Sequence, residues 1–123
     1  NTDWEFVMDL SPSLISFDAY TGAREFLLYQ DALAEYLEGG GIVAWGIVPS
    51  QPDLFSGCTP EQLSGVFTGI RDQVTGFCSP ETFYRQSVIT PTCGIQSGDR
   101  ETAYRIMQAT RTLSLQAREG YEG

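Results

Sequence analysis

The stretch of sequence that decides the fold is the continuous apolar run GIVAWGIV at residues 41–48. The run has the length of a strand, and it lacks the apolar–polar alternation of a strand with one face in water. Runs of this kind are typical of parallel strands that are buried on both faces. Residues 41–48 therefore predict a buried parallel strand in an α/β sheet.

Two shorter segments, one on each side of this run, also have the character of strands. Residues 14–20 are apolar, β-prone and polar at the end, and residues 87–91 form a third strand directly before Cys93 and Gly94. The segment after the first strand predicts a helix. Residues 23–38 carry apolar side chains at helical spacing, and three glycines end the pattern where a left-handed residue is needed.

Helix signals also follow the second and third strands. Residues 49–57 are expected to form a loop, after which Thr59 caps a helix that has Pro60 at its first position and Gln62 at its third. A short helical segment opens at Ser79. The positions that share one face of the last helix are Ala103, Ile106, Met107, Thr110 and Leu113.

The order of segments is strand-helix, three times over, after a short helical stretch at residues 3–10. The connections are long enough for right-handed parallel crossovers, so we expect three parallel strands side by side in sequence order. Three such units cannot close an eight-stranded barrel. A doubly wound sheet is the alternative, but no G-x-G-x-x-G or G-x-x-x-x-G-K-[ST] supports a nucleotide-binding version.

Length and charge limit the classes of protein to which the chain can belong. Its 123 residues form one domain at most, and 16 acidic residues against seven arginines, with no lysine or histidine, give a net charge of −9. Nucleic acid and anionic membrane surfaces require basic side chains, so we expect neither as a partner. No segment approaches the roughly 20 apolar residues of a membrane span, and no signal peptide is visible. Three widely spaced cysteines fit a reducing compartment, and we expect a cytoplasmic protein.

Reactive groups of a parallel α/β fold lie at the carboxyl ends of its strands. Asp18, Trp45 and Cys93 fall at the end of the first strand, within the second and just after the third. A thiolate and a carboxylate that converge can hold Zn²⁺ when other ligands are supplied. Each also has an ordinary interpretation, because a lone cysteine is often a small buried side chain and a strand-end aspartate often caps a turn. Cys58 and Cys78 lie in or beside loops, and we expect them away from the strand ends.

Four segments of the chain resemble cobalamin-independent methionine synthases of the uroporphyrinogen decarboxylase/methionine synthase superfamily. They are residues 1–4, 15–20, 42–49 and 89–94, which follow one another at the spacing seen in those proteins. The most specific piece is Pro91-Thr92-Cys93-Gly94, which is similar to the Pro-x-Cys-Gly at the end of the last barrel strand. The resemblance covers residues 1–123 and implies a partial TIM (β/α)8 barrel, namely its last three β/α units with parallel strands.

The same resemblance implies a zinc site and a methyl transfer. The cysteine of the family motif is a zinc ligand, which assigns Cys93, and Asp18 falls where the family has a zinc-binding glutamate. The other two ligands form a His-x-Cys motif that, by the same alignment, would lie just before Asn1. In the family, zinc binds a thiol, which loses its proton and attacks a methyl group on a carrier. An Asp and a His that assist this step are replaced here by Val48 and Pro49 or their neighbours, which leaves the thiol and the methyl donor unassigned.

Three functions are therefore expected as alternatives. The first is the carboxyl-terminal part of a zinc-dependent methyltransferase related to methionine biosynthesis, inactive on its own. The second is a uroporphyrinogen decarboxylase-like enzyme without a metal, in which Arg24, Arg85 and Arg100 bind substrate carboxylates. The third is a non-catalytic α/β module that works through assembly. Because three units leave sheet edges uncovered, we expect a homo-oligomer or association with the missing part of the barrel.

Overall fold

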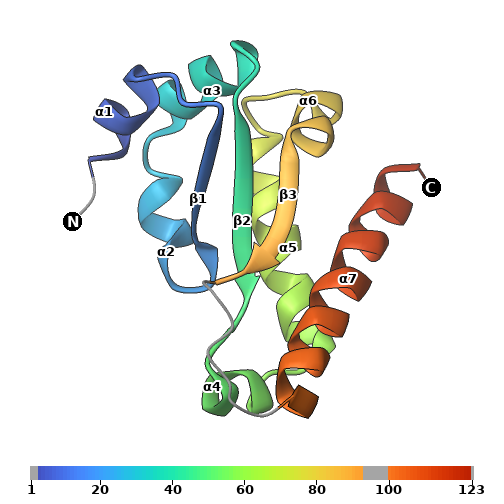
Figure 1. Cartoon of the computed structure of the whole chain (residues 1–123). Coiled ribbons are helices and arrows are strands. Elements are labelled where there is room, and N and C mark those ends of the chain that lie inside the picture. The colour runs from blue at the N-terminus through green and yellow to red at the C-terminus, as the bar shows by residue number, and fades with distance from the viewer. Residues whose placement is uncertain (1–2, 93–99, 123) are drawn as a thin grey trace.

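The fold is a mixed α/β arrangement around a three-stranded parallel sheet (Figure 1). The computed structural model describes residues 3–92 and 100–122, without the side chains of 120–122. The strands are β1 (Leu14–Asp18), β2 (Ile42–Val48) and β3 (Ser87–Pro91), and their order in the sheet is β1-β2-β3. Both pairings are parallel. The expectation of three parallel strands in sequence order is confirmed.

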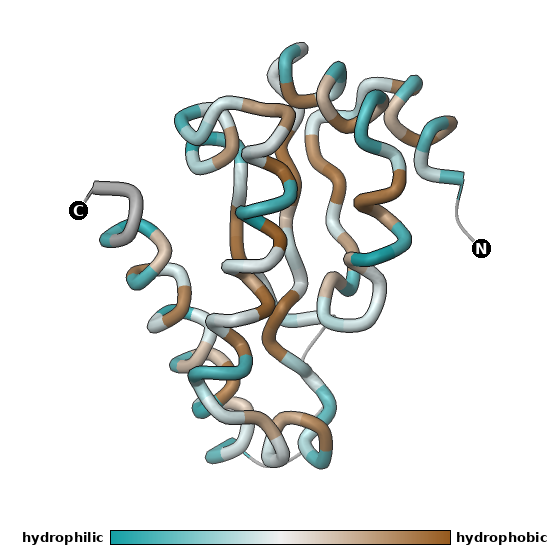
Figure 2. Tube along the Cα trace, turned by 180° about the vertical axis from the view of Figure 1, so that it is seen from behind, coloured by the Kyte–Doolittle hydropathy of each residue, from teal (hydrophilic) through white to brown (hydrophobic). Residues whose placement is uncertain are grey.

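Helices of the described chain lie on one face of this sheet. The helices of the described residues are α1 (Trp4–Asp9), α2 (Ala19–Phe26), α3 (Gln30–Glu38), α4 (Pro52–Ser56), α5 (Pro60–Val74), α6 (Pro80–Arg85) and α7 (Arg100–Glu122). Of these, α4 lies beyond the carboxyl ends of the strands and not over a face of the sheet (Figure 1). In Figure 1 the sheet is seen from its uncovered face. Figure 2 shows the molecule from the opposite side, where helices cover the sheet. Leu14 and Val88 point to the uncovered face and are 51% and 47% exposed. Within the described ranges, no helix is long and apolar enough to cross a membrane.

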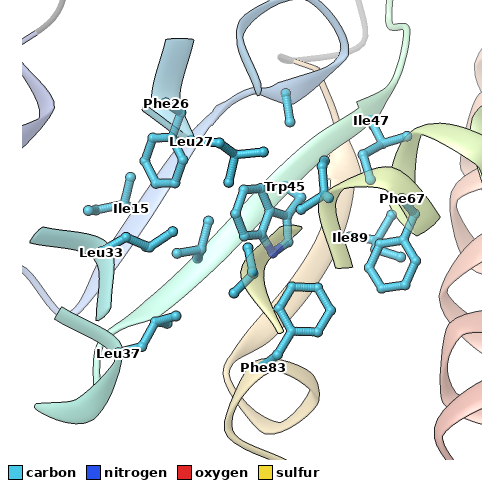
Figure 3. Close-up of a cluster of buried hydrophobic side chains, with 14 of the residues drawn as sticks. Ile15, Phe26, Leu27, Leu33, Leu37, Trp45, Ile47, Phe67, Phe83 and Ile89 are labelled. Carbon is cyan, nitrogen blue, oxygen red and sulfur yellow. The ribbon is translucent and has the colours of Figure 1, made fainter. Parts of the chain in front are cut away.

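The helix-covered face of β2 carries the centre of the core. Trp45 is fully buried, and its ring centroid lies 5.5 Å from that of Phe26 and 6.3 Å from that of Phe83 (Figure 3). Its indole Nε1 donates a hydrogen bond of 3.0 Å to Ser87 Oγ on the neighbouring strand. The expectation that Trp45 belongs to a reactive strand end is therefore wrong, because its side chain points into the core and its polar atom is already satisfied.

The other face of β2 is buried by the neighbouring strands themselves. Ala44 is buried although no helix of the described residues covers this face, because its side chain is small and lies between flanking strands. Gly46 is more constrained still. A Cβ at this position would lie 2.6 Å from the carbonyl oxygen of Phe17 and 3.0 Å from that of Pro91. The predicted burial of both faces of the strand is confirmed, and small residues provide it on the open side.

Helix boundaries follow local capping more closely than apolar spacing. The helix expected over residues 23–38 is two helices, since the turn at Leu27–Tyr29 breaks the hydrogen-bond pattern between α2 and α3. β1 ends at Asp18 rather than at residue 20, because the carboxylate of Asp18 caps α2. The loop expected over residues 49–57 contains α4, which begins with a proline at its first turn.

The capping predicted for α5 is confirmed. Thr59 N donates to Gln62 Oε1 at 2.8 Å, and Gln62 N donates to Thr59 Oγ1 at 3.1 Å. These reciprocal bonds satisfy two backbone donors that the first turn of a helix leaves free. On the buried side of this helix, Leu63, Phe67 and Ile70 enter the core. The segment that joins β2 to α5 contains α4 and ends at this cap.

The close passage of β2 between its neighbours gives a direct test of the fold. Gly46→Ala should lower the free energy of unfolding by about 1–3 kcal/mol, because the added methyl group overpacks against backbone atoms. Gly69→Ala is the matched control, since it is inside α5 and a methyl group added there would meet no atom within 4 Å. This change should stabilise by about 0.5–1 kcal/mol. Urea unfolding measures both, and equal effects of the two substitutions would contradict the tight passage at Gly46.

Candidate functional site

The carboxyl ends of the three strands meet at one end of the sheet, which is the lower end in Figure 1. This carboxyl edge is formed by Asp18 at the end of β1, by the segment that follows β2, and by Thr92 after β3. The turn to α4 and the start of α7 lie at the same end (Figure 1). The topology therefore brings together the places where reactive groups of a parallel sheet are found.

Asp18 lies at this edge as expected, and its carboxylate caps α2. Its Oδ1 accepts a hydrogen bond from Thr21 N at 3.1 Å, and its Oδ2 accepts one from Thr21 Oγ1 at 2.9 Å. These two bonds fix the orientation of the carboxylate. Each carboxylate oxygen has a further lone pair, so capping leaves capacity to bind a second partner. The role of Asp18 as the cap of α2 is therefore compatible with its expected role as a zinc ligand.

A row of three residues crosses the sheet next to this edge. Asp18 pairs with Gly46 on β2, and Gly46 pairs with Thr90 on β3. Because paired residues present their side chains to the same face, Asp18 and Thr90 flank the glycine on the open side of the sheet. Thr90 Oγ1 is buried and has no hydrogen-bond partner among the described residues. A carboxylate and an unsatisfied hydroxyl therefore stand on either side of a position that has no side chain.

Cys93 lies outside the described residues, but the approach to it is well defined. Thr92 N donates to the carbonyl oxygen of Val48 at 2.8 Å. Thr92 Oγ1 accepts from Ser50 N at 3.1 Å and lies 3.0 Å from Ser50 Oγ. Ser50 is only 1% exposed. These bonds join the chain after β3 to the chain after β2, and they fix the backbone that leads into Cys93.

Ser50, Thr90 and Thr92 were not recognised as site residues from the sequence. Their only signal is that each is a polar residue within an apolar strand or within two residues of its end. That signal is common in turns, where hydroxyls bond to nearby backbone groups. The structure brings these residues together by contacts between distant parts of the chain. The hydrogen bond between Ser50 and Thr92, for example, joins residues 42 positions apart.

Cys58 lies closer to this edge than expected. Its Sγ is 3.3 Å from the phenol oxygen of Tyr20, which is in the first turn of α2 directly after β1. The hydrogen bond with Cys58 raises the pKa of Tyr20 above its usual value, and the charge of the thiolate and burial act in the same direction. The expectation that Cys58 lies away from the strand ends is corrected by this contact, which the sequence does not encode locally.

Cys78 lies at the opposite end of the sheet, in agreement with its expected structural role. It directly precedes Ser79, which caps α6 at the upper end in Figure 1. Burial is the main cause that raises the pKa of the Cys78 thiol, and the negative charge of Glu38 adds to it. A thiol with a raised pKa is a poor nucleophile and a poor metal ligand at neutral pH.

A partly open cavity of about 180 Å³ lies beside Cys58, between α7 and the α4–α5 region. Most of its lining is apolar, with Phe55 and Leu63 on one side and Leu113 on the other. Only the thiol of Cys58 and the side chains of α7 residues such as Gln108 offer polar contacts. The cavity is too small for most cofactors, because ligand pockets usually enclose several hundred Å³.

Metal ligands and arginines do not form a complete site in the described part of the chain. No group of three or more His, Cys, Asp or Glu residues there is arranged to hold a metal ion. The arginines of the metal-free alternative do not converge. Arg85 is bound to Glu81 on α6 at one end of the sheet, whereas Arg100 begins α7 at the other end (Figure 1).

The capping role of Asp18 predicts a contrast between two substitutions. Asp18→Ala removes the cap and should lower the free energy of unfolding by about 1 kcal/mol. Asp18→Asn keeps a good capping side chain without its charge, and it should leave stability nearly unchanged. Thermal or urea unfolding of both variants measures the difference. An Asn variant as unstable as the Ala variant would show that the charge of Asp18, and not its cap, stabilises the folded chain.

Comparison of the chain with protein-family models, with curated proteins and with solved structures finds no match.

Proposed function

We propose that the chain is the carboxyl-terminal part of a methionine synthase-like TIM barrel, and that the intact protein is a zinc-dependent methyltransferase acting on a thiol. The proposal rests most of all on one combination. The Pro91-Thr92-Cys93-Gly94 segment begins with the last residue of β3, and Asp18 ends β1 at the same edge of a parallel sheet. The resemblance assigns a zinc ligand to Cys93 and a second to Asp18.

The arrangement of layers supports a piece of barrel wall. In a TIM barrel, parallel strands follow one another in sequence order, helices cover the outer face and side chains fill the interior. Here the strand order is β1-β2-β3, helices of the described chain lie on one face, and Leu14 and Val88 are exposed on the other. In the proposed barrel, this open face is the interior, which the remaining strands would cover.

The donor atoms at the carboxyl edge are suited to zinc. A cysteine thiolate and an aspartate carboxylate are both ordinary zinc ligands, and at least one further protein ligand is required for a stable site. By the resemblance, the others would come from a His-x-Cys motif preceding Asn1. When bound, zinc would lower the pKa of a substrate thiol and hold its sulfur in place.

The residues of this chain would position that chemistry. The bonds from Thr21 orient the Asp18 carboxylate, and the bonds of Thr92 to β2 fix the backbone that leads to Cys93. Thr90 Oγ1 lies on the same face as Asp18, is buried and has no hydrogen-bond partner among the described residues, so that its partner would come from the completed site. Gly46 between them keeps the three strands close at this point, because a Cβ there would lie 2.6 Å from the carbonyl oxygen of Phe17 and 3.0 Å from that of Pro91.

A second candidate function is a non-catalytic module that acts by assembly, and the one-sided sheet favours it. β1 and β3 have no strand partner on their outer sides among the described residues, and exposed apolar side chains lie near both. Under either function we propose that the chain associates, with itself or with the remaining barrel units, in the cytoplasm. The metal-free decarboxylase-like alternative is less well supported, because its arginines are dispersed.

Zinc content tests the leading proposal. A longer chain that includes the segment before Asn1 should bind one zinc ion per chain, and Cys93→Ser should abolish tight binding. Cys78→Ser is the matched control and should retain zinc, because Cys78 lies at the opposite end of the sheet. Atomic emission after exhaustive dialysis measures the metal.

The 123-residue chain alone should retain little zinc after dialysis, because two ligands do not form a stable site. Stoichiometric zinc in the Cys93→Ser variant of the longer chain would remove Cys93 from the site. Tight zinc on the 123-residue chain would show that the ligand set is wrong.

A further inference from the structure

On the side of the molecule formed by β3 and α7, arginines are in slight excess, since α7 has four arginines and three glutamates (Glu101, Glu119 and Glu122). Four of the seven arginines of this acidic chain are on α7. The exposed face of that helix next to β3 is formed by Met107, Arg111, Leu115 and Arg118, which we call the α7 stripe. With Ile89 and Pro91 of β3, these residues line an open groove of about 560 Å³.

The α7 stripe has the composition of an interface. Met107 and Leu115 are exposed apolar side chains, and arginines are spaced between and beyond them. No ion pair joins Arg111 or Arg118 to another residue of the described part of the chain, in contrast to Arg71, Arg85 and Arg105. The groove follows β3, whose outer edge has no strand partner there. Unpaired strand edges are templates for pairing with another chain.

The opposite side of the molecule is complementary in charge and also carries exposed apolar residues. The outward side of α1 carries the exposed Phe6, and its C-cap Leu10 is also exposed, beside the carboxylates of Glu5 and Asp9. Helical spacing places these four residues on one contiguous face, which we call the α1 patch. Leu14 at the start of β1 continues the exposed apolar surface. β1 is the other edge strand of the sheet.

We propose that the β3–α7 side of one copy binds the β1–α1 side of a second copy, so that the parallel sheet continues from one chain into the next. Arg111 and Arg118 of the α7 stripe meet Glu5 and Asp9 of the α1 patch, and the exposed apolar side chains are buried between them. The partner is a second copy because the chain carries both complementary surfaces on opposite edges of one sheet. This inference specifies self-association, one of the two associations included in the proposed function, in which a second copy occupies the sheet edges that the remaining barrel units would otherwise cover. It is independent of zinc and of methyl transfer.

The proposed contact is heterologous, since each copy uses two different surfaces. Such contacts produce a ring if the rotation between copies closes, and an open chain if it does not. The parallel direction of all strands is retained only in this head-to-tail arrangement, which also aligns the carboxyl edges of both copies. A symmetric contact between two α7 stripes would instead bring arginines together, and one between two α1 patches would bring carboxylates together.

Charge reversal on each side tests the proposal. The wild-type chain should associate with increasing concentration in analytical ultracentrifugation. Arg111→Glu with Arg118→Glu should weaken this association by about 100-fold, and so should Glu5→Arg with Asp9→Arg, because each places like charges opposite one another. Both sets of positions are on the surface, so circular dichroism should show an unchanged fold.

Mixing the two double variants decides between partners. Association should return in an equimolar mixture, because the unaltered α7 stripe of one variant meets the unaltered α1 patch of the other.

Arg24→Glu with Arg85→Glu gives the same net charge as the α7 variant at exposed positions away from the groove, and it should associate like the wild type. A mixture that stays monomeric, a wild-type chain that is monomeric at all concentrations, or equal loss in the control would overturn the proposal. None of these results depends on bound zinc, so the zinc experiment can fail or succeed separately.

Discussion

The structure depends on the burial of β2 between two parallel neighbours. Trp45 fills the space between the sheet and the helices, and Gly46, the next residue, allows the strands to approach on the opposite face. The two residues act on opposite sides of the same strand. A large side chain on the covered face contributes apolar burial and aromatic contacts, whereas the open face tolerates only small side chains at its centre. The remaining elements are placed by their contact with this strand, either directly or through the core.

This constraint has consequences at both ends and both edges of the sheet. At the carboxyl edge, close strands put Asp18 and Thr90 on either side of Gly46, and they allow Ser50 and Thr92 to bond across the ends of β2 and β3. At its sides, the sheet has no further strand paired with β1 or β3 among the described residues. The same small sheet therefore offers a convergent polar site at one end and a means of association at its sides. The proposed barrel and the proposed head-to-tail contact both use these uncovered surfaces, in the first case by adding other units and in the second by adding a copy.

Much of the fold could be predicted from the sequence, because the decisive signals are local. The apolar run of β2, the capping residues of α5 and the alternation of strands and helices gave the parallel order correctly. The division of residues 23–38 into two helices could not be foreseen, since Phe26 and Leu33 keep helical spacing across the break.

At the site, Asp18 could be predicted because it ends a strand. The contact of Cys58 with Tyr20 joins residues 38 positions apart and has no local signal. Trp45 was misplaced because an unbroken apolar run does not reveal which face each side chain takes.

Residue-resolved amide hydrogen exchange tests the central role of β2 most directly. If the fold depends on this strand, its amides between Val43 and Val48 should exchange only through global unfolding. Their free energies of exchange should then equal the free energy of unfolding measured with urea, and the amides of α1 and α7 should exchange faster through local opening. Amides of β2 that exchange as fast as those of α7 would contradict the account, because the strand would then open without unfolding the rest of the chain.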